Sequence, residues 1–246
     1  MRTVMRFQHI YKIIFILIVA LFLPLIQTCL AVITPAPIPI PVGRVVWIKG
    51  TSLKAVMPNK EQRFLQKLSL IYLHDVLITD AKTEAEIVFT DNTLLTFRPN
   101  SQISIDQYSY KPKAKAKGSV GKYLMSLIEG GFRTITGLIA KNNPSDYEVN
   151  TPVATIGVRG TDYTVYSHKN QVYVGEYKGS PCVTNKGKTK HKELCLNKKA
   201  PYAFVASSEA APTPLKRKPE IFKEKLKILP AVITPVGIKA AEKKGS

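Results

Sequence analysis

The residues best suited to specific recognition lie close together between Thr151 and Asp162. Arg159 stands between two glycines, Gly157 and Gly160, and its guanidinium carries five donors in a fixed plane. Such an arginine could clamp a carboxylate or a row of backbone carbonyls, or it could bind an anionic ligand. We favour the structural role, because an arginine in a β-turn usually satisfies backbone acceptors. Asp162 is its nearest candidate partner in the sequence.

Other residues of this stretch have special backbone roles. Pro152 fixes its own φ and holds Thr151 extended, while glycines permit positive φ or the close approach of another backbone. The candidate motif for structure or binding therefore comprises Thr151, Pro152, Gly157, Arg159, Gly160, Thr161 and Asp162.

Two cysteines, Cys182 and Cys195, are expected to form a disulfide that closes a short, lysine-rich loop. The expectation depends on export, because an even pair in an oxidising compartment usually bridges. The alternative is a redox or nucleophilic thiol near His191, which would need a third, orienting group.

Groupings typical of enzymes are not apparent in the sequence. No strand-loop-helix phosphate motif occurs. The histidines lack metal-ligand spacing with one another; they are His74, His168 and His191. Some aspartates could supply a carboxylate pair, but they fall at strand ends and turns, where aspartate makes local hydrogen bonds; these are Asp75, Asp80, Asp91 and Asp106. We expect no catalysis, no metal and no cofactor.

The elements that position these residues follow a pattern of short strands. Ala85 to Thr90 alternates with period two, Asp91-Asn92 makes a turn, and strands over Thr93 to Arg98 and Gln102 to Tyr108 flank a second turn. Strands are also expected over 45–48, 163–166 and 171–175, with a tight turn at 167–170. Polar Pro58 to Gln66 is expected to be a loop or short helix. The spacing also predicts a brief helix over 122–128, ended by Gly130-Gly131. The fold class is therefore all-β.

The chain divides by composition into four regions. Residues 1–31 have a positive start, an apolar run over 13–26 and small residues before a cleavage site after Ala31, which is typical of a secretion signal. An uncleaved anchor and a lipid anchor on Cys29 are the alternatives. Residues 32–43 form a proline-rich extended linker, 44–205 the β domain, and 206–246 a basic, largely disordered tail. The protein is expected in the periplasm or outside the cell.

Several segments resemble the FecR domain family. The matching residues include Leu73 to Thr79, Phe89 to Thr93, Pro99 to Ser101, Leu127 to Arg133, Thr136 to Lys141 and, most specifically, Thr151 to Tyr163. The resemblance covers about Gly43 to Tyr177 and implies a β-solenoid-like or sandwich-like domain that makes protein contacts outside the cytoplasm. His74 stands where the family usually has glycine. The anti-sigma segment of the classical transducers has no counterpart before the apolar run, so direct sigma-factor control is not expected.

The formal net charge of +19 allows two kinds of partner. The first is an envelope protein bound by the β domain, which acts as a sensing or scaffold module. The alternative is a basic surface-adhesive protein that binds anionic glycan or lipid through lysines, of which the candidates are Lys111, Lys113, Lys115 and Lys117. These lysines could equally be solvated loop residues. Nucleic acid is not expected as a partner, because export removes the protein from it and aromatic residues do not alternate with the lysines.

Overall fold

The computed structural model describes residues 40–111, 120–158, 160–188, 192–223 and 226. The signal segment, Arg159, Lys113, Lys115, Lys117 and His191 lie outside these residues, and so do the predictions made for them. Within the described residues, no helix is long and apolar enough to cross a membrane. All of them belong to one unit, Pro39–Ser246.

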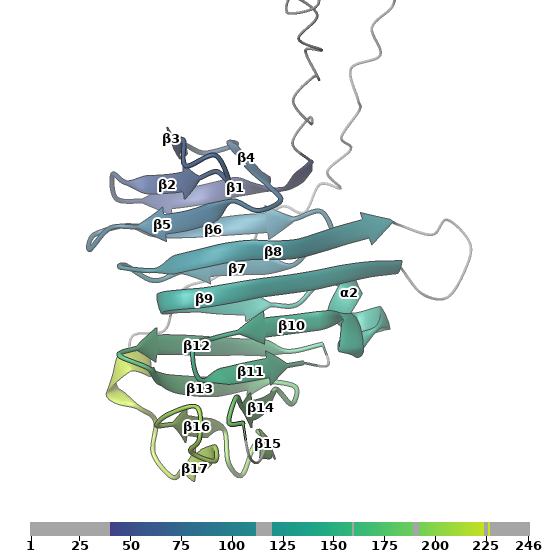
Figure 1. The fold of residues 1–246 in the computed structure, drawn as a ribbon, viewed down its shortest axis with the longest axis vertical. Helices are drawn as coiled ribbons and strands as arrows, with labels where there is room; N and C mark the ends of the chain where they lie inside the picture. Colours follow the sequence, from purple (N-terminus) through teal and green to yellow (C-terminus); the bar gives the residue numbers. More distant parts are fainter. Residues whose placement is uncertain (1–39, 112–119, 159, 189–191, 224–225, 227–246) are drawn as a thin grey trace, which may run out of the picture. The chain divides into compact units, whose positions relative to one another are not determined.

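Strands dominate the described part of the chain, which confirms the all-β prediction (Figure 1). The strands are β1 (Pro41–Lys49), β2 (Leu53–Val56), β3 (Gln62–Phe64), β4 (Leu70–Tyr72), β5 (Val76–Thr79), β6 (Glu84–Phe89), β7 (Leu94–Phe97), β8 (Gln102–Lys111), β9 (Val120–Ile135), β10 (Tyr147–Asn150), β11 (Ala154–Gly157), β12 (Asp162–His168), β13 (Gln171–Lys178), β14 (Cys182–Asn185), β15 (Glu193–Cys195), β16 (Tyr202–Val205) and β17 (Thr213–Leu215). The short helices are α2 (Leu138–Asn142), η1 (Pro144–Asp146) and η2 (Glu220–Phe222).

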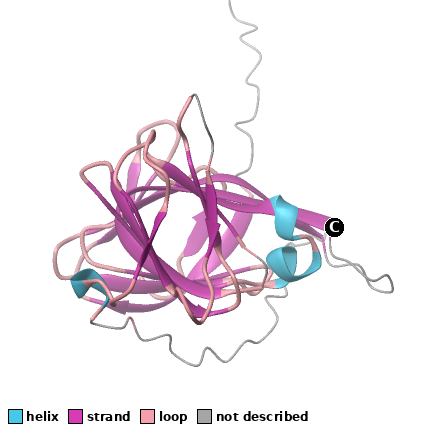
Figure 2. Ribbon diagram, turned by 90° about the horizontal axis from the view of Figure 1, so that it is seen from below, coloured by secondary structure: helices cyan, strands magenta, loops and turns pink. Residues whose placement is uncertain are grey.

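The strands form two sheets that share β9. Sheet A runs in the order β4-β1-β6-β7-β9-β12-β13-β16-β17. Sheet B runs in the order β3-β2-β5-β8-β9-β10-β11-β14-β15. Strands lie on opposite sides of the interior when the fold is viewed end on (Figure 2). Every pairing is antiparallel except that of β9 with β10.

Strand β9 turns the corner between the sheets at Gly130. Residues up to Glu129 pair with β8 in sheet B, and residues from Gly130 pair with β12 in sheet A. Gly130 has a φ of +79°, and a Cβ there would lie 2.2 Å from the carbonyl oxygen of Asn100. The helix predicted over 122–128 is therefore wrong. The inward residues Tyr123, Met125 and Leu127 follow period two, and the glycines bend a strand rather than end a helix.

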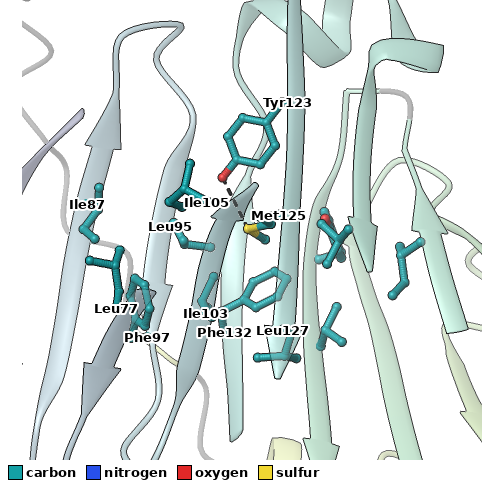
Figure 3. Packing of buried hydrophobic residues seen from close by; sticks show 14 of the residues in the cluster. Leu77, Ile87, Leu95, Phe97, Ile103, Ile105, Tyr123, Met125, Leu127 and Phe132 are labelled. Atoms are coloured by element: carbon teal, nitrogen blue, oxygen red, sulfur yellow. Dashed lines mark hydrogen bonds between the residues drawn. The ribbon is translucent and has the colours of Figure 1, made fainter. Parts of the chain in front are cut away.

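The core fills the space between the sheets. Alternate residues of the central strands point inward and are fully buried, as for Leu77, Ile87, Leu95, Ile103 and Met125 (Figure 3). An aromatic group lies beside them, and in it the Tyr123 ring stacks on Tyr147 with centroids 4.5 Å apart. This burial of apolar surface on both sheets is the main stabilising term.

The predicted turns are confirmed, and they use residues with positive φ. Asn92 and Asn100 have φ values of 66° and 54°, and Lys169-Asn170 close the β12–β13 hairpin with 48° and 56°. His74, at a position where glycine was expected from the resemblance, has a φ of 68° and so keeps a left-handed conformation. Asparagine tolerates this region better than most residues, whereas histidine is less common there.

The boundary predicted at residue 205 differs from the structure. Strand β17 and helix η2 lie beyond it, and Phe222 is fully buried. The Phe222 ring lies 5.8 Å from the Arg98 guanidinium and 6.5 Å from the Tyr202 ring. Residues 206–223 are thus folded, because burial of the Phe222 ring stabilises a segment that is otherwise poor in apolar residues.

Two further boundaries differ from the prediction. Strand β1 begins at Pro41, inside the predicted linker, and β3 occupies part of the predicted 58–66 loop.

Candidate functional site

The Thr151–Tyr163 block carries the chain from one sheet to the other. Strand β11 belongs to sheet B and β12 to sheet A, so the described residues Val158, Gly160 and Thr161 lie in the crossover. Gly160 has a φ of +62°, which explains one glycine of the motif. Val158 is buried, so the crossover is anchored in the core.

Two threonines of the block fix its backbone. The Thr151 amide and hydroxyl donate to the Ala154 carbonyl at 2.8 and 2.7 Å, and the Thr151 hydroxyl accepts from the Ala154 amide at 2.9 Å. Thr161 donates its amide to the Thr136 hydroxyl at 2.8 Å, and the Thr136 amide donates to the Thr161 carbonyl at 3.0 Å. Pro152 is exposed. These residues have structural roles.

Asp162 binds an arginine that the sequence did not single out. Arg133 Nε donates to Asp162 Oδ1 at 2.9 Å and its Nη2 donates to Oδ2 at 2.6 Å, a bidentate pair across strands β9 and β12. The remaining guanidinium nitrogen of Arg133 donates to the Leu226 carbonyl at 2.9 Å, and the guanidinium lies 4.6 Å from the Tyr177 ring. Arg133 thereby ties the C-terminal segment to sheet A.

A pocket lies beside Gly157, at the end of β11. Its walls are Pro144, Ser145, Gly157, Val158, Ser180, Cys182 and Glu193, and its volume is about 270 Å³. A Cβ on Gly157 would meet nothing within 4 Å, and Gly157 has no positive φ. Glycine is therefore needed at position 160 for its backbone conformation, whereas neither the backbone conformation nor a neighbouring atom requires glycine at position 157. Because Gly157 has no side chain, none fills the pocket at this position.

Cys182 and Cys195 form the predicted disulfide, which joins paired positions of β14 and β15. Glu193 lies close enough that its carboxylate and the two sulfurs fall within 4.8 Å of one another. With both sulfurs in the disulfide, they are not available as thiolate ligands. Lys111 is exposed at the end of β8, and it is the candidate anion-contacting lysine among the described residues.

Three of the aspartates considered for acid-base chemistry lie at strand ends or turns and accept from backbone amides two or three residues away, as predicted; these are Asp75, Asp80 and Asp91. The prediction is wrong for Asp106, which lies within β8 and bonds across to β9. Asp91 is fully buried and accepts from the Thr93 amide at 3.1 Å, the Thr93 hydroxyl at 2.9 Å and the Ile139 amide at 3.3 Å. Burial raises the pKa of Asp91 above its ordinary value, and these hydrogen bonds oppose the rise. The Asp106 carboxylate accepts from Ser104 and Ser126 at 2.6 Å each. Asp91 therefore holds the β6–β7 turn against α2.

An exposed apolar surface lies at the β3–β4 end of the two sheets. Its residues are Phe64, Leu68 and Leu70, with exposed fractions of 69, 64 and 41%; we call it the β3–β4 surface. Leu68 sits at the tip of the β3–β4 turn with a φ of 74°. Among the described strands, β3 pairs with β2 alone and β4 with β1 alone, so both sheets have an open edge here.

Cations surround the β3–β4 surface. The Lys54 ammonium lies 5.0 Å from the centre of the Phe64 ring. Lys60 and Lys67 are exposed in the turns that flank β3. Arg63 is held in place by ion pairing with Asp75, by a hydrogen bond to the Leu70 carbonyl at 3.0 Å and by stacking on Tyr72. This arrangement fixes β3 against β4.

Sequence reasoning missed both the Arg133 pairing and the β3–β4 surface. Leu68 and Leu70 belong to a largely apolar run in the sequence, and nothing local indicates that their side chains face solvent. Arg133 belongs to a segment identified by resemblance, although its partners Asp162 and Leu226 lie 29 and 93 residues away.

Comparison with known families agrees with the motifs. Residues 75–180 match the family described as FecR protein, which confirms the resemblance and includes the Thr151–Tyr163 block. A crystal structure of a candidate anti-sigma factor from Parabacteroides distasonis ATCC 8503 is similar, with 13% identity and a TM-score of 0.39. The similarity covers 56% of this chain and 57% of that chain, so it spans little more than half of that protein. No curated protein matches.

Proposed function

We propose that this chain is an exported, non-catalytic protein-interaction module that acts in the cell envelope as a scaffold or sensor. The observation that carries the proposal is the exposure of Phe64 on the edge strand β3 and of Leu68 in the turn that follows it. Burying an exposed phenylalanine or leucine side chain is favourable by about 1.5–3 kcal/mol relative to leaving it in water. A partner that covers Phe64 and Leu68 would gain this free energy on binding. Clustered exposed apolar residues of this kind mark interaction surfaces.

The FecR match supports a role in recognition rather than catalysis. The described residues of the family block act in the crossover, in hydrogen bonds and in the Arg133–Asp162 pair, which hold two sheets in a fixed relation. A rigid β scaffold that presents a surface at one end is suited to binding a partner with little ordering cost.

Co-purification from an envelope extract tests the proposal. The tagged chain from Val32 onward is washed at low and then at high salt, in parallel with a Phe64→Ser/Leu68→Ser variant. An Ile128→Ser variant is the matched control, because Ile128 is 40% exposed on β9 in the middle of the sheets. We expect a discrete partner that survives high salt with the wild type and the control and is lost with the double variant.

Loss of all bound material at high salt would contradict the proposal. Interactions between exposed charges are screened beyond the Debye length, which falls from about 8 Å at physiological ionic strength to about 3 Å at 1 M salt, whereas apolar contacts are not weakened by salt. Such a loss would support binding of the basic chain to an anionic glycan or lipid surface instead.

A further inference from the structure

Within the described part of the chain, the edge of β3 has unpaired backbone groups beside its exposed apolar residues. The Leu65 amide donates to the Leu53 carbonyl at 2.8 Å, and the Met57 amide donates to the Glu61 carbonyl at 2.9 Å. Hydrogen-bonded positions alternate along an antiparallel pair, so the amides and carbonyls of Gln62 and Phe64 point away from β2. These groups offer two donors and two acceptors to an added strand.

Those backbone groups favour a polypeptide over a lipid as the molecule that covers the surface. An acyl chain provides no hydrogen-bond partner, and a backbone amide or carbonyl without one in an apolar environment costs several kcal/mol. An extended peptide satisfies the same groups by strand pairing, with side-chain contacts to Phe64 providing selectivity.

The charge around β3 determines the chemistry of the partner. Between Leu53 and Asp75 the charged residues are Lys54, Lys60, Arg63 and Lys67 against Glu61 and Asp75. Arg63 pairs with Asp75, so the lysines carry the excess positive charge. Lys54 lies directly across from Phe64 in the β2–β3 register. Lys54 and Phe64 therefore lie on the same face of the sheet, and a partner strand that pairs with β3 would meet an ammonium group beside an aromatic ring there. This suits an acidic and an apolar residue on one face of the partner strand, two positions apart.

A second copy of this chain does not fit the edge. Pairing β3 with β3 would bring the lysines of both copies together, and edge lysines are a common device against such self-association. We propose that β3 binds an extended acidic segment of a partner protein, in which glutamate or aspartate and apolar residues share one face of the strand. This inference rests on the proposed function and specifies the partner class at the same surface.

The test measures fluorescence anisotropy of short labelled peptides with the chain from Val32 onward. The Glu-Val peptide repeats Glu-Thr-Val-Thr, so that Glu and Val share one face. The Lys-Val peptide has Lys in place of Glu, and the Glu-Pro peptide has Pro in place of Thr and cannot donate backbone hydrogen bonds at every second residue. We expect the wild type to bind the Glu-Val peptide at least about tenfold more tightly than the other two, which corresponds to about 1.4 kcal/mol.

Variants separate the contributions of charge, apolar contact and backbone. Lys54→Glu/Lys67→Glu should reverse the preference toward the Lys-Val peptide, and Phe64→Ser should weaken binding about tenfold. Gln62→Pro removes an amide that points away from β2 and should abolish strand pairing. Lys122→Glu and Ile128→Ser are controls at an exposed lysine and an exposed apolar residue on β9 and should bind as the wild type does. Circular dichroism verifies that each variant is folded.

Equal binding of the Glu-Val and Lys-Val peptides would overturn the inference, and so would unchanged binding by Gln62→Pro. Tight binding to phosphatidylglycerol vesicles with no binding to the Glu-Val peptide would assign the surface to lipid. Salt-resistant co-purification that depends on Phe64 and Leu68, combined with failure of the acidic peptide, would leave the proposed function standing and exclude only this partner class.

Discussion

Gly130 and Gly157 both occupy strands, yet a methyl group at each position would meet very different surroundings. At Gly130 it would clash with the Asn100 carbonyl oxygen at 2.2 Å on a backbone with a φ of +79°. We expect Gly130→Ala to lower the free energy of unfolding by more than about 2 kcal/mol. Gly157→Ala should change it by less than about 0.5 kcal/mol, because nothing lies within 4 Å. Urea denaturation of both variants checks the contrast, and equal losses would contradict it.

Arg133 links three elements through one side chain. Replacing it by alanine leaves the Asp162 carboxylate without its bidentate partner and frees the Leu226 carbonyl. We expect Arg133→Ala to destabilise the protein by about 3 kcal/mol, and Arg133→Lys by less, since lysine keeps the charge but not the fork. The exposed Lys122→Ala is the control on the same strand, β9.

Limited proteolysis gives Arg133 a second, local readout. Lys216, Arg217 and Lys218 are exposed in the segment between β17 and η2. If Arg133 holds this segment against sheet A, trypsin should cleave there faster in Arg133→Ala than in wild type under native conditions. Unchanged cleavage together with an intact fold would show that Phe222 alone holds the segment.

At the scale of elements, Asp91 couples the β6–β7 turn to α2 and makes stability depend on pH. Its pKa in the folded state is raised above 3.8, chiefly by burial. The folded state therefore binds more protons than the unfolded state between these two pKa values. The contribution of Asp91 to the free energy of unfolding falls as pH rises from about 4 through the raised pKa. Chemical denaturation across this range should show a shallower pH dependence in Asp91→Asn.

The β14–β15 hairpin is stabilised by the Cys182–Cys195 disulfide. The bridge closes a loop with a sequence separation of 13, for which loop entropy predicts a contribution of about 3 kcal/mol. A thiol count on the unreduced chain from Val32 onward should find no reactive thiol. Reduction should lower the melting temperature, and a Cys182→Ser/Cys195→Ser variant should be insensitive to reductant.

The strands over 84–108 could be predicted because period-two alternation and Asp-Asn or Pro-Asn turns are local signals. The corner in β9 could not be predicted, because a glycine pair can either end a helix or bend a strand. Only the pairing of β9 with β8 and β12 distinguishes the two cases. The fold of 206–223 escaped prediction because a single buried aromatic, Phe222, anchors a segment of ordinary loop composition.

The candidate site was predictable only in part. The Thr151–Tyr163 block was recognised by its glycines, threonines and proline. Asp162 was matched with Arg159, which lies outside the described residues, whereas in the structure the Asp162 carboxylate binds Arg133. The partner itself, Arg133, comes from another strand, and the exposure of Phe64 and Leu68 depends on where the sheet edges fall. Both are properties of tertiary structure, which spacing in one sequence does not encode.

At the scale of the whole molecule, the central claim is that the β3–β4 surface contacts a protein in the envelope. Site-specific photo-crosslinking in intact cells tests it most directly, with a photoreactive phenylalanine analogue placed at Phe64 and, as control, at Ile128. We predict that irradiation yields a discrete crosslinked protein from position 64 and none from position 128. Crosslinks only to lipid, or the same products from both positions, would contradict the claim.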